Sequence, residues 1–295
     1  MEKKGRLSRI GIFSQVLNEG TVEVIGQVLS LGESESIAWF LNPELRQYLD
    51  SLAMTNKSTF TACVSSSLEE MQVDAIICIG GDGSILRVAR TRPDLPILSV
   101  NKGRKGFMTE IHPNDVSSKI KEFLTGRFVL EEHTKIDAFL KTKYLGSCIN
   151  ECVITSTDLL KTIDFQLFVD EMLTSRSLAD GIIISTPIGS TGHCLSSGGI
   201  LIDPALENFE VVWINPVDLT VRPIVLSSKR KIKIISTTRV NPIKLVFDGQ
   251  DSVTFEETPI EIEFRPSLET VKFLRSSHFT SRWRRNFHPG LRDQS

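Results

Sequence analysis

Glycines and a carboxylate interrupt an apolar run in the first third of the chain. Residues 76–90 read IICIGGDGSILRVAR, so the aliphatic residues break into Gly80-Gly81-Asp82-Gly83-Ser84 and then resume at helical spacing. Glycine has no Cβ, so the backbone there can approach a ligand closely, and its N–H groups can bind an anion. A carboxylate beside a phosphate takes the proton of an attacking hydroxyl or helps to hold Mg²⁺. The stretch therefore predicts either phosphate chemistry around Asp82 or a plain strand-to-helix turn with Asp82 as the helix cap.

A second glycine loop, NKGRKGFM, runs from Asn101 to Met108 after another apolar strand. In an open α/β sheet, ligands collect at the carboxyl ends of the strands, so we expect the two loops to form two walls of one cleft. Lys102, Arg104 and Lys105 could neutralise phosphate there, or could simply be solvated. No Walker A sequence and no protein-kinase signature set occurs in the chain, so phosphate chemistry would use a different scaffold.

A third stretch, residues 179–199, reads ADGIIISTPIGSTGHCLSSGG. An apolar strand enters a run of small hydroxylated residues and glycines, which can line a pocket with donors and acceptors and little bulk. A histidine alone is more often structural than catalytic. Because His193 lies among these small hydroxylated residues and glycines, we expect it to line that pocket.

The elements that must position these loops alternate between strand and helix in the first third. Strands are expected at residues 9–13, 37–41, 74–79 and 96–100, and helical stretches at 21–31, from 43 and at 84–90. Strands that alternate with helices and end in glycine-bearing loops predict an α/β domain with a parallel, doubly wound sheet.

After about Pro113 the pattern of apolar residues along the sequence changes. One amphipathic helix, residues 116–125, precedes many short runs rich in β-branched and aromatic residues. These runs are expected to be strands at residues 128–130, 135–140, 148–155, 162–169, 181–185, 211–214, 231–235, 243–247 and 260–264. Their spacing predicts a β-rich, antiparallel, sandwich-like second domain, with the boundary near residues 112–115.

Composition narrows the classes of function. A length of 295 residues suits two domains, and the formal net charge of −2 gives no basic field for nucleic acid or an anionic membrane. We see no secretory segment and no run of about 20 apolar residues, so we expect a cytoplasmic protein.

The basic tail, residues 276–285, is expected to be a solvated helix, the alternative being contact with nucleic acid. The scattered cysteines predict reduced structural thiols, and Cys148 and Cys152 lack the second pair that a zinc site needs.

Five elements together resemble the NAD kinase family, in the family's order and at similar spacings. They are the GGDGS loop at 80–84, the N-x-G-x-x-G-F loop at 101–107, Asn150-Glu151, the stretch 180–196 and Asp248-Gly249-Gln250. The stretch 216–225 also resembles the family's β-domain, and the match covers roughly Arg9 to Leu274. The GGDG sequence by itself is shared with diacylglycerol and sphingosine kinases and with phosphofructokinases, so it is the combination that points to the family.

The resemblance implies transfer of the terminal phosphate of ATP to the 2′-hydroxyl of the adenosine ribose of NAD, which gives NADP. It implies a Rossmann-like domain at residues 1–112, a β-rich NAD-binding domain at 113–269, and a last segment, about 270–295, that packs back on the first domain. It further implies Mg²⁺ or another divalent cation, ATP (or polyphosphate) as the donor, and a homodimer or homotetramer.

The resemblance also implies roles for single residues, and Asp82 matches the family's catalytic base. The NAD-binding set is Asp82, Gly83, Phe107, Asn150, Glu151, Asp180, Ile188, Thr191, Gly192, His193 and Ser196. The phosphate-binding set is Gly80, Gly81, Gly83, Ser84, Arg87, Asn101, Gly103 and Lys105. Asp248 and Gln250 are expected to belong to the same pocket, and no residue is expected to bind a structural metal. This chain has Gly192-His193 where the family commonly has Ala-Tyr, and Ile188 where it usually has threonine or serine. Both differences lie in the stretch that binds adenosine, so they could change how the base of the nucleotide is recognised.

Two other functions fit part of the pattern. A lipid kinase of the diacylglycerol type would share the first loop, but the stretch 180–196 and the second glycine loop suit a dinucleotide better. A non-catalytic NADP(H)-binding regulator would bind the dinucleotide and form no product, and nothing in the sequence requires it because Asp82 is present.

Overall fold

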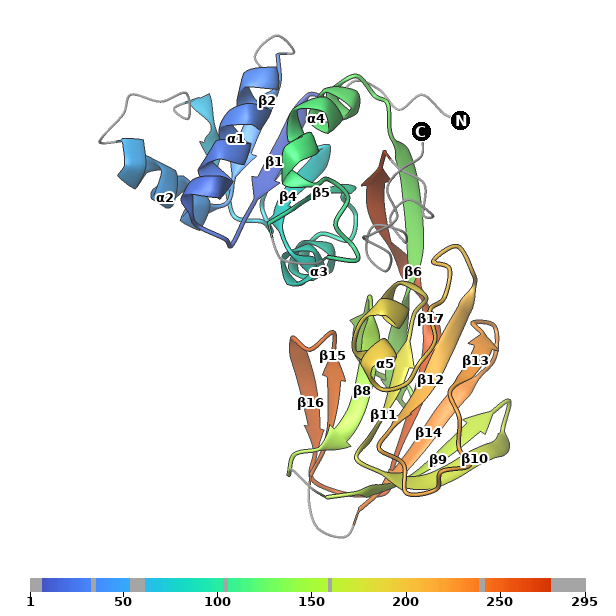
Figure 1. The fold of residues 1–295 in the computed structure, drawn as a ribbon. Coiled ribbons are helices and arrows are strands. Elements are labelled where there is room, and N and C mark those ends of the chain that lie inside the picture. The colour runs from blue at the N-terminus through green and yellow to red at the C-terminus, as the bar shows by residue number, and fades with distance from the viewer. Residues whose placement is uncertain are drawn as a thin grey trace. The chain divides into compact units, whose positions relative to one another are not determined.

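The computed structural model describes residues 7–32, 36–53, 62–102, 106–158, 161–238 and 242–276 (Figure 1). The chain divides into two compact units. One contains the residues up to Glu132 together with the segment from Val271, and the other is His133–Thr270. Gly103, Arg104 and Lys105, and the tail after Ser276, lie outside the described residues, so the predictions made for them stay predictions. Within the described part of the chain, no helix is long and apolar enough to cross a membrane.

The first unit is built on an open sheet with strand order β5-β4-β1-β2-β3, and all of these pairings are parallel. Its strands are β1 (Arg9–Phe13), β2 (Ala38–Leu41), β3 (Val64–Ser65), β4 (Ala75–Gly80) and β5 (Ile97–Asn101). Its helices are α1 (Glu19–Gly32), α2 (Pro43–Ala53), α3 (Asp82–Thr91), the short 3-10 helix η3 (Pro113–Asp115) and α4 (Val116–Leu124). The predicted parallel α/β domain is confirmed.

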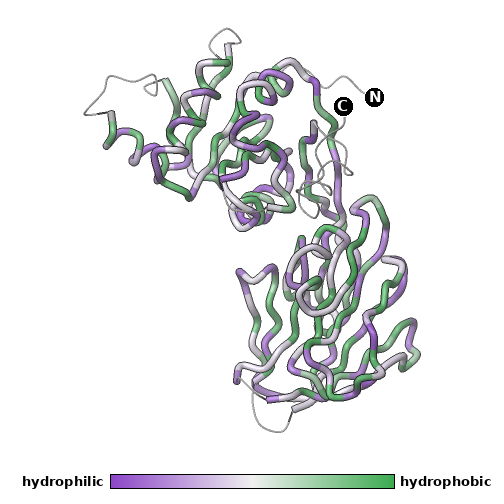
Figure 2. The backbone as a smooth tube through the Cα atoms, in the orientation of Figure 1, coloured by the Kyte–Doolittle hydropathy of each residue, from purple (hydrophilic) through white to green (hydrophobic). Residues whose placement is uncertain are grey.

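Burial explains why these segments form these elements. All six residues of β4 are buried, as expected for a central strand covered on both faces. Helix α1 buries a single stripe that includes Val24, Ile25 and Val28, and in Figure 2 hydrophobic and hydrophilic stretches alternate along the helices of this unit. Helix α4 adds Val116 and Ile120 to the same core. The first unit therefore extends past the domain boundary that the sequence predicts near residues 112–115.

The second unit consists of two sheets that share one core. One sheet has the order β13-β12-β11-β8-β15-β16, and the other contains β10-β9-β14-β17 with β6 and β7. The strands are β6 (Val129–Leu140), β7 (Lys143–Cys148), β8 (Glu151–Ser156), β9 (Ile163–Val169), β10 (Met172–Ala179), β11 (Gly181–Ser185), β12 (Asn208–Ile214), β13 (Ile224–Ser227), β14 (Ile232–Thr237), β15 (Ile243–Phe247), β16 (Asp251–Phe255) and β17 (Ile260–Arg275). The pairings along β13-β12-β11-β8-β15-β16, along β10-β9-β14-β17 and between β6 and β7 are antiparallel, and residues of both sheets form the hydrophobic cluster of this unit. This confirms the predicted antiparallel sandwich.

Several boundaries differ from the prediction. Residues 148–155 do not form one strand, because the chain turns at Ile149 and Asn150, between β7 and β8. The segments 128–130 and 135–140 belong largely to one long strand, β6. Strand β10 was missed since its sequence, MLTSRSLA, lacks a continuous apolar run, and most of its residues are exposed.

Strand β17 takes part in both units. Its first half pairs with β14 in the second unit, and its Phe273 pairs in parallel with Ile97 of β5 in the first. The strand ends at Arg275, so a residue distant in sequence from the glycine loops is brought to the first unit's sheet.

Candidate functional site

The first glycine loop connects β4 to α3 with little room to spare. Gly80 ends β4, and a Cβ on it would lie 2.5 Å from the Ser84 hydroxyl oxygen, so glycine lets the first turn of α3 pack against the strand. A Cβ on Gly81 or Gly83 would meet nothing within 4 Å, so the backbone of these two residues faces open space. This is the exposure that an anion-binding loop at a helix N-terminus requires.

Asp82 does not cap its own helix. The N-cap of α3 is Gly81, which makes no side-chain cap hydrogen bond, and Asp82 is the first helical residue. Its carboxylate instead accepts the N–H groups of Phe107 at 3.0 Å and Met108 at 3.1 Å. Gly106, just before them, allows this approach because a Cβ there would lie 2.6 Å from the Thr109 hydroxyl and 3.1 Å from Asp82 Oδ1.

The two glycine loops therefore meet at the carboxyl edge of the sheet. Gly80 and Asn101 are paired residues at the ends of β4 and β5, and the Lys102 N–H donates to the Gly80 carbonyl at 3.0 Å. Burial raises the pKa of the Asp82 carboxyl, while the N–H groups of Phe107 and Met108 and the charge of Arg275 lower it, with a net rise. The geometry gives a partly buried, oriented carboxylate at the edge where α/β proteins bind ligands.

The basic side chains of this region point to different places. Lys102 reaches the start of α1, where a Cβ on Gly20 would lie 2.6 Å from its Nζ. Arg87 is exposed on α3 and its charge helps to lower the pKa of Glu44, after the larger effect of a hydrogen bond from Asn42.

In the second unit, Asp248 fixes the turn that carries Asn150 and Glu151. Its carboxylate accepts the N–H groups of Ile149 at 2.9 Å, Asn150 at 2.7 Å and Glu151 at 3.2 Å. Asp248 and Gly249 both have positive φ, 51° and 66°, and close the hairpin between β15 and β16. The Gln250 N–H completes that turn by donating to the Phe247 carbonyl at 2.9 Å.

Glu151 and Asn150 present acceptors that the described residues leave unused. Glu151 Oε2 and Asn150 Oδ1 are both buried, and neither has a hydrogen-bond partner within the described part of the chain. Burial, and then the nearby charge of Asp248, raise the pKa of Glu151 to about 7. Because a buried acceptor without a donor is costly, the pair indicates a place for a ligand that donates hydrogen bonds.

The hydroxyl-rich stretch packs directly on this turn. Thr186 donates its hydroxyl to the Ile149 carbonyl at 2.6 Å and its N–H to the Asn150 carbonyl at 2.8 Å. A Cβ on Gly189 would lie 2.2 Å from the Asn150 carbonyl oxygen, and one on Gly192 would lie 3.2 Å from Glu151 Oε2. The stretch thus contacts the same turn, Asn150 and Glu151, that the carboxylate of Asp248 also holds.

The remaining residues of the stretch differ in exposure. Ile188 begins the 3-10 helix η4 (Ile188–Thr191) and is buried, and its carbonyl accepts the Thr191 hydroxyl at 3.2 Å. His193 and Ser196, in the short helix α5 (His193–Ser196), are exposed.

Asp180 does not join this cluster. It precedes β11, whereas Glu151 is paired with Ser185 at the other end of that strand, so roughly 16 Å of strand separates them. Asp180 instead accepts a hydrogen bond from the Asn215 side chain at 2.9 Å.

Two contributors escaped the sequence analysis. Thr186 lies inside the highlighted stretch, but only its hydrogen bonds to the Asn150 turn show what it does. Arg275 influences Asp82 from 193 positions further along the chain, and no local pattern signals that contact.

An open parallel sheet with two glycine loops meeting at its carboxyl edge is an architecture of nucleotide-binding α/β proteins, and a carboxylate held there suits phosphoryl transfer. Comparison with known proteins identifies the protein family. Residues 40–128 match the family model described as the ATP-NAD kinase N-terminal domain, and residues 149–276 match the ATP-NAD kinase C-terminal domain. The chain belongs to the NAD kinase family.

Relatives and solved structures agree with this assignment. The chain is 38% identical over 213 residues to an NAD kinase of Thermococcus gammatolerans, covering 72% of this chain and 76% of the relative. The fold is similar to the crystal structure of an NAD kinase from Archaeoglobus fulgidus in complex with ATP, with a TM-score of 0.72, 26% identity and coverage of 95% and 97%. It is also similar to yeast NADH kinase complexed with NADH, with a TM-score of 0.83, 19% identity and coverage of 99% and 90%, a likeness of fold.

Proposed function

We propose that this protein transfers the terminal phosphate of ATP to the 2′-hydroxyl of the adenosine ribose of NAD. The observation that carries the proposal is the Asp82 carboxylate, partly buried where the two glycine loops meet and held by two backbone N–H groups. A carboxylate offers about four acceptor positions, so Asp82 keeps free capacity for a hydroxyl. It would orient the 2′-oxygen and accept its proton, late in a loose phosphoryl-transfer transition state.

The Asn150 turn is the proposed holder of the adenosine half of NAD. Glu151 Oε2 and Asn150 Oδ1 would accept hydrogen bonds from hydroxyl or amine groups of the nucleotide, which would relieve two buried acceptors. Asp248 and Thr186 support the turn and do not need to touch the ligand themselves. In the proposal Thr191, Gly192, His193 and Ser196 also take part in binding NAD in this unit, and Phe107 takes part in the first unit.

The glycine loops are the proposed phosphate site. The exposed backbone of Gly81 and Gly83 at the start of α3 would receive the transferred phosphate, with Arg87 and Asn101 at its margin.

Mg²⁺ is proposed to arrive with ATP. No cluster of three or more metal-binding side chains occurs among the described residues, and Mg²⁺ commonly uses one or two carboxylates together with water and substrate phosphates. The free acceptor capacity of Asp82 fits that donor set. When bound, the ion would neutralise charge on the phosphates during transfer.

We also infer a homodimer or homotetramer. Strand β10 lies at the edge of its sheet and leaves Met172 and Leu173 exposed at 70% and 51%, a surface that a second copy could cover. Light scattering at several protein concentrations tests this inference.

The test of function is purified protein with Mg²⁺, each of NAD and NADH as acceptor, and each of ATP and polyphosphate as donor. NADP is read with an NADP-specific dehydrogenase, and diacylglycerol serves as the competing acceptor. We expect NADP or NADPH and no lipid phosphate. Lipid phosphate alone would favour the lipid kinase, and binding of dinucleotide without any product would favour a regulator.

A further inference from the structure

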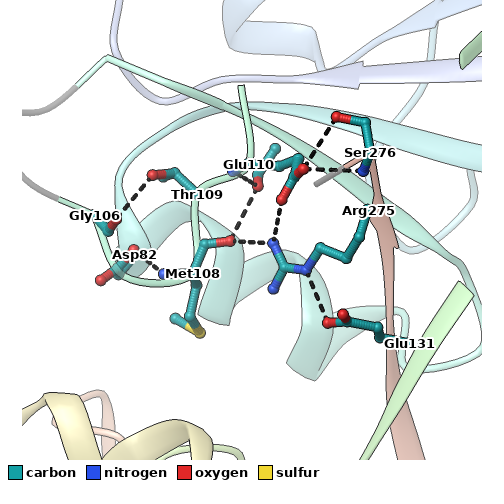
Figure 3. Close-up of polar contacts among 9 residues, drawn as sticks. Asp82, Gly106, Met108, Thr109, Glu110, Glu131, Arg275 and Ser276 are labelled. Carbon is teal, nitrogen blue, oxygen red and sulfur yellow. Dashed lines mark hydrogen bonds and ion pairs between the residues drawn. The ribbon is translucent and has the colours of Figure 1, made fainter. Parts of the chain in front are cut away.

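Arg275, at the end of β17, is a buried cation tied to the second glycine loop (Figure 3). Only 5% of its side chain is exposed. One Nη1 hydrogen bond reaches the Met108 carbonyl at 2.8 Å, and the guanidinium pairs with Glu131 at 3.3 Å and Glu110 at 3.5 Å. The planar fork of arginine can serve such separate acceptors at once, which a lysine ammonium on a single stem does less well.

The contact continues from Arg275 to Asp82 through one residue. The Met108 carbonyl faces Arg275, and the Met108 N–H donates to Asp82. The Ser99 hydroxyl also donates to that carbonyl at 3.2 Å. Fixing the carbonyl on one side of Met108 restricts the peptide N–H on its other side, because only two backbone dihedrals separate them.

The neighbour of Arg275 provides a second tie to the same loop. Ser276 donates both its N–H, at 2.9 Å, and its hydroxyl, at 3.1 Å, to Glu110. Glu110 is itself almost fully buried, with 1% of its side chain exposed, and its N–H bonds to the Ser99 hydroxyl at 2.9 Å. Arg275 at the end of β17 and Ser276 directly after it therefore both contact the segment 108–110 (Figure 3).

A buried ion-pair cluster is an expensive way to hold a loop. Desolvation of buried charges often cancels their attraction, so apolar packing would stabilise the fold at least as well. What apolar packing lacks is charge, and the positive charge of Arg275 acts against the rise that burial causes in the pKa of Asp82.

We propose that Arg275 is a positioning residue for Asp82: it holds the carbonyl of Met108, and Met108 donates its N–H to the Asp82 carboxylate. The proposal rests on the proposed function only for its kinetic readouts. Arg275 is not a catalytic residue, since it acts through Met108.

The matched pair of variants is Arg275→Met and Arg92→Met. Arg92 is a partly buried arginine of the same unit, with 14% of its side chain exposed, that also donates to backbone carbonyls, those of Leu68 and Met71, and pairs with Asp94. It lies at the far end of α3 from Asp82. A merely structural arginine should behave alike at both positions.

We expect Arg275→Met to lower kcat for NADP formation by about 10–100-fold, because small misplacements of a catalytic group have effects of that size. KM for NAD and ATP should change less than threefold. The acid limb of the kcat–pH profile should move to higher pH, since the positive charge of Arg275 lowers the pKa of Asp82 and the methionine removes that charge. Arg92→Met should leave kcat and the profile as in the wild type, and Arg275→Lys should restore the position of the acid limb.

An activity-independent readout separates failure of this proposal from failure of the proposed function. Hydrogen exchange of the Phe107 and Met108 amides should be slow in the wild type and in Arg92→Met, and at least tenfold faster in Arg275→Met. If Arg275→Met folds poorly, the double variant Arg275→Met/Glu110→Gln, which also removes the negative charge of Glu110, is measured instead. Unchanged amide exchange with unchanged kcat, or an equal loss in Arg92→Met, would overturn the proposal.

Discussion

Asp82 and Glu151 show how environment assigns different tasks to two carboxylates. Asp82 is partly buried and receives two N–H donors, whereas Glu151 is buried, leaves one oxygen without a partner among the described residues, and lies near the charge of Asp248. The first arrangement keeps an oriented acceptor for a proton, and the second keeps an acceptor waiting for a donor. In the proposed function, the same chemical group, a carboxylate, therefore serves phosphoryl transfer in one unit and nucleotide recognition in the other.

Glu151 predicts a pH dependence of stability. Its pKa is raised from an ordinary 4.5 to about 7, so its contribution is fully present below pH 4.5 and is lost as the pH rises to about 7. The loss is on the order of 3 kcal/mol, at 1.36 kcal/mol per pKa unit. Glu151→Gln should therefore raise Tm by roughly 5 °C at pH 8 and by little at pH 4.5, measured by calorimetry without ligand.

The control for that prediction is Glu207→Gln, at an exposed position of the same unit. A gain in Tm that is equal at both pH values would show that ionisation of Glu151 does not limit stability.

Predictability from sequence differed among single residues. Asp82 could be chosen because it lies in a short local pattern with a chemical reason behind it, and Asn150 and Glu151 because they match a motif of the NAD kinase family. Arg275 could not, because its role depends on a strand that returns from the end of the chain. The helix-cap interpretation of Asp82 was open on sequence grounds and is wrong, since its oxygens turn to residues 107 and 108 and away from its own helix.

Among the elements, turns decide where the site residues lie. The Asp248-Gly249 turn and the η4 segment both contact the short connection between β7 and β8, which would otherwise expose its backbone N–H groups to the interior. The side chain of Asp248 supplies the acceptors that a strand ladder would have supplied. This is also why the prediction of a continuous strand over residues 148–155 was wrong. The Ile149 N–H donates to the side chain of Asp248, 99 positions further along the chain, and does not take part in strand pairing.

Gly189 provides the test at this scale. Gly189→Ala would place a Cβ 2.2 Å from the Asn150 carbonyl oxygen, which is backbone and cannot give way cheaply. We expect a loss of about 1–3 kcal/mol in the free energy of unfolding, as for overpacked sites, and a rise in KM for NAD of at least about tenfold. Denaturant unfolding and steady-state kinetics measure the two effects.

Gly26→Ala, in the middle of α1, is the matched control. Nothing lies within 4 Å of its Cβ position, so this change should stabilise the protein by up to about 1 kcal/mol and leave KM unaltered. If Gly189→Ala behaves like Gly26→Ala, the close packing on Asn150 does not position the nucleotide turn.

The whole molecule joins two units with different core architectures. The fold class of each could be predicted, because apolar strands alternate with helical stretches in the first unit, and short runs rich in β-branched and aromatic residues follow one another at regular spacing in the second. Their extent did not follow, since α4 packs on the first core and β6 and β17 each belong partly to both units. Such membership depends on tertiary packing that a single sequence does not display.

At this scale, binding of the dinucleotide should stabilise the protein by mass action. NAD at 100 times its Kd should add about 2.7 kcal/mol to the free energy of unfolding. Asn150→Ala should abolish most of the resulting rise in Tm, whereas Asn114→Ala, on η3 of the first unit, should keep it. An undiminished rise in Asn150→Ala, measured by thermal shift at matched NAD concentrations, would remove Asn150 from the binding site.

The most direct measurement of the central claim compares NADP formation by the wild type, Asp82→Asn and Asp74→Asn, with Mg²⁺, ATP and saturating NAD. Asp74 is the matched control, because its carboxylate also accepts backbone N–H groups, from Ser8 and Arg9, just before β4. The account predicts a fall in kcat of about 10²–10⁴-fold for Asp82→Asn with NAD binding retained, and wild-type kcat for any folded Asp74→Asn. A kcat for Asp82→Asn within tenfold of the wild type would contradict it.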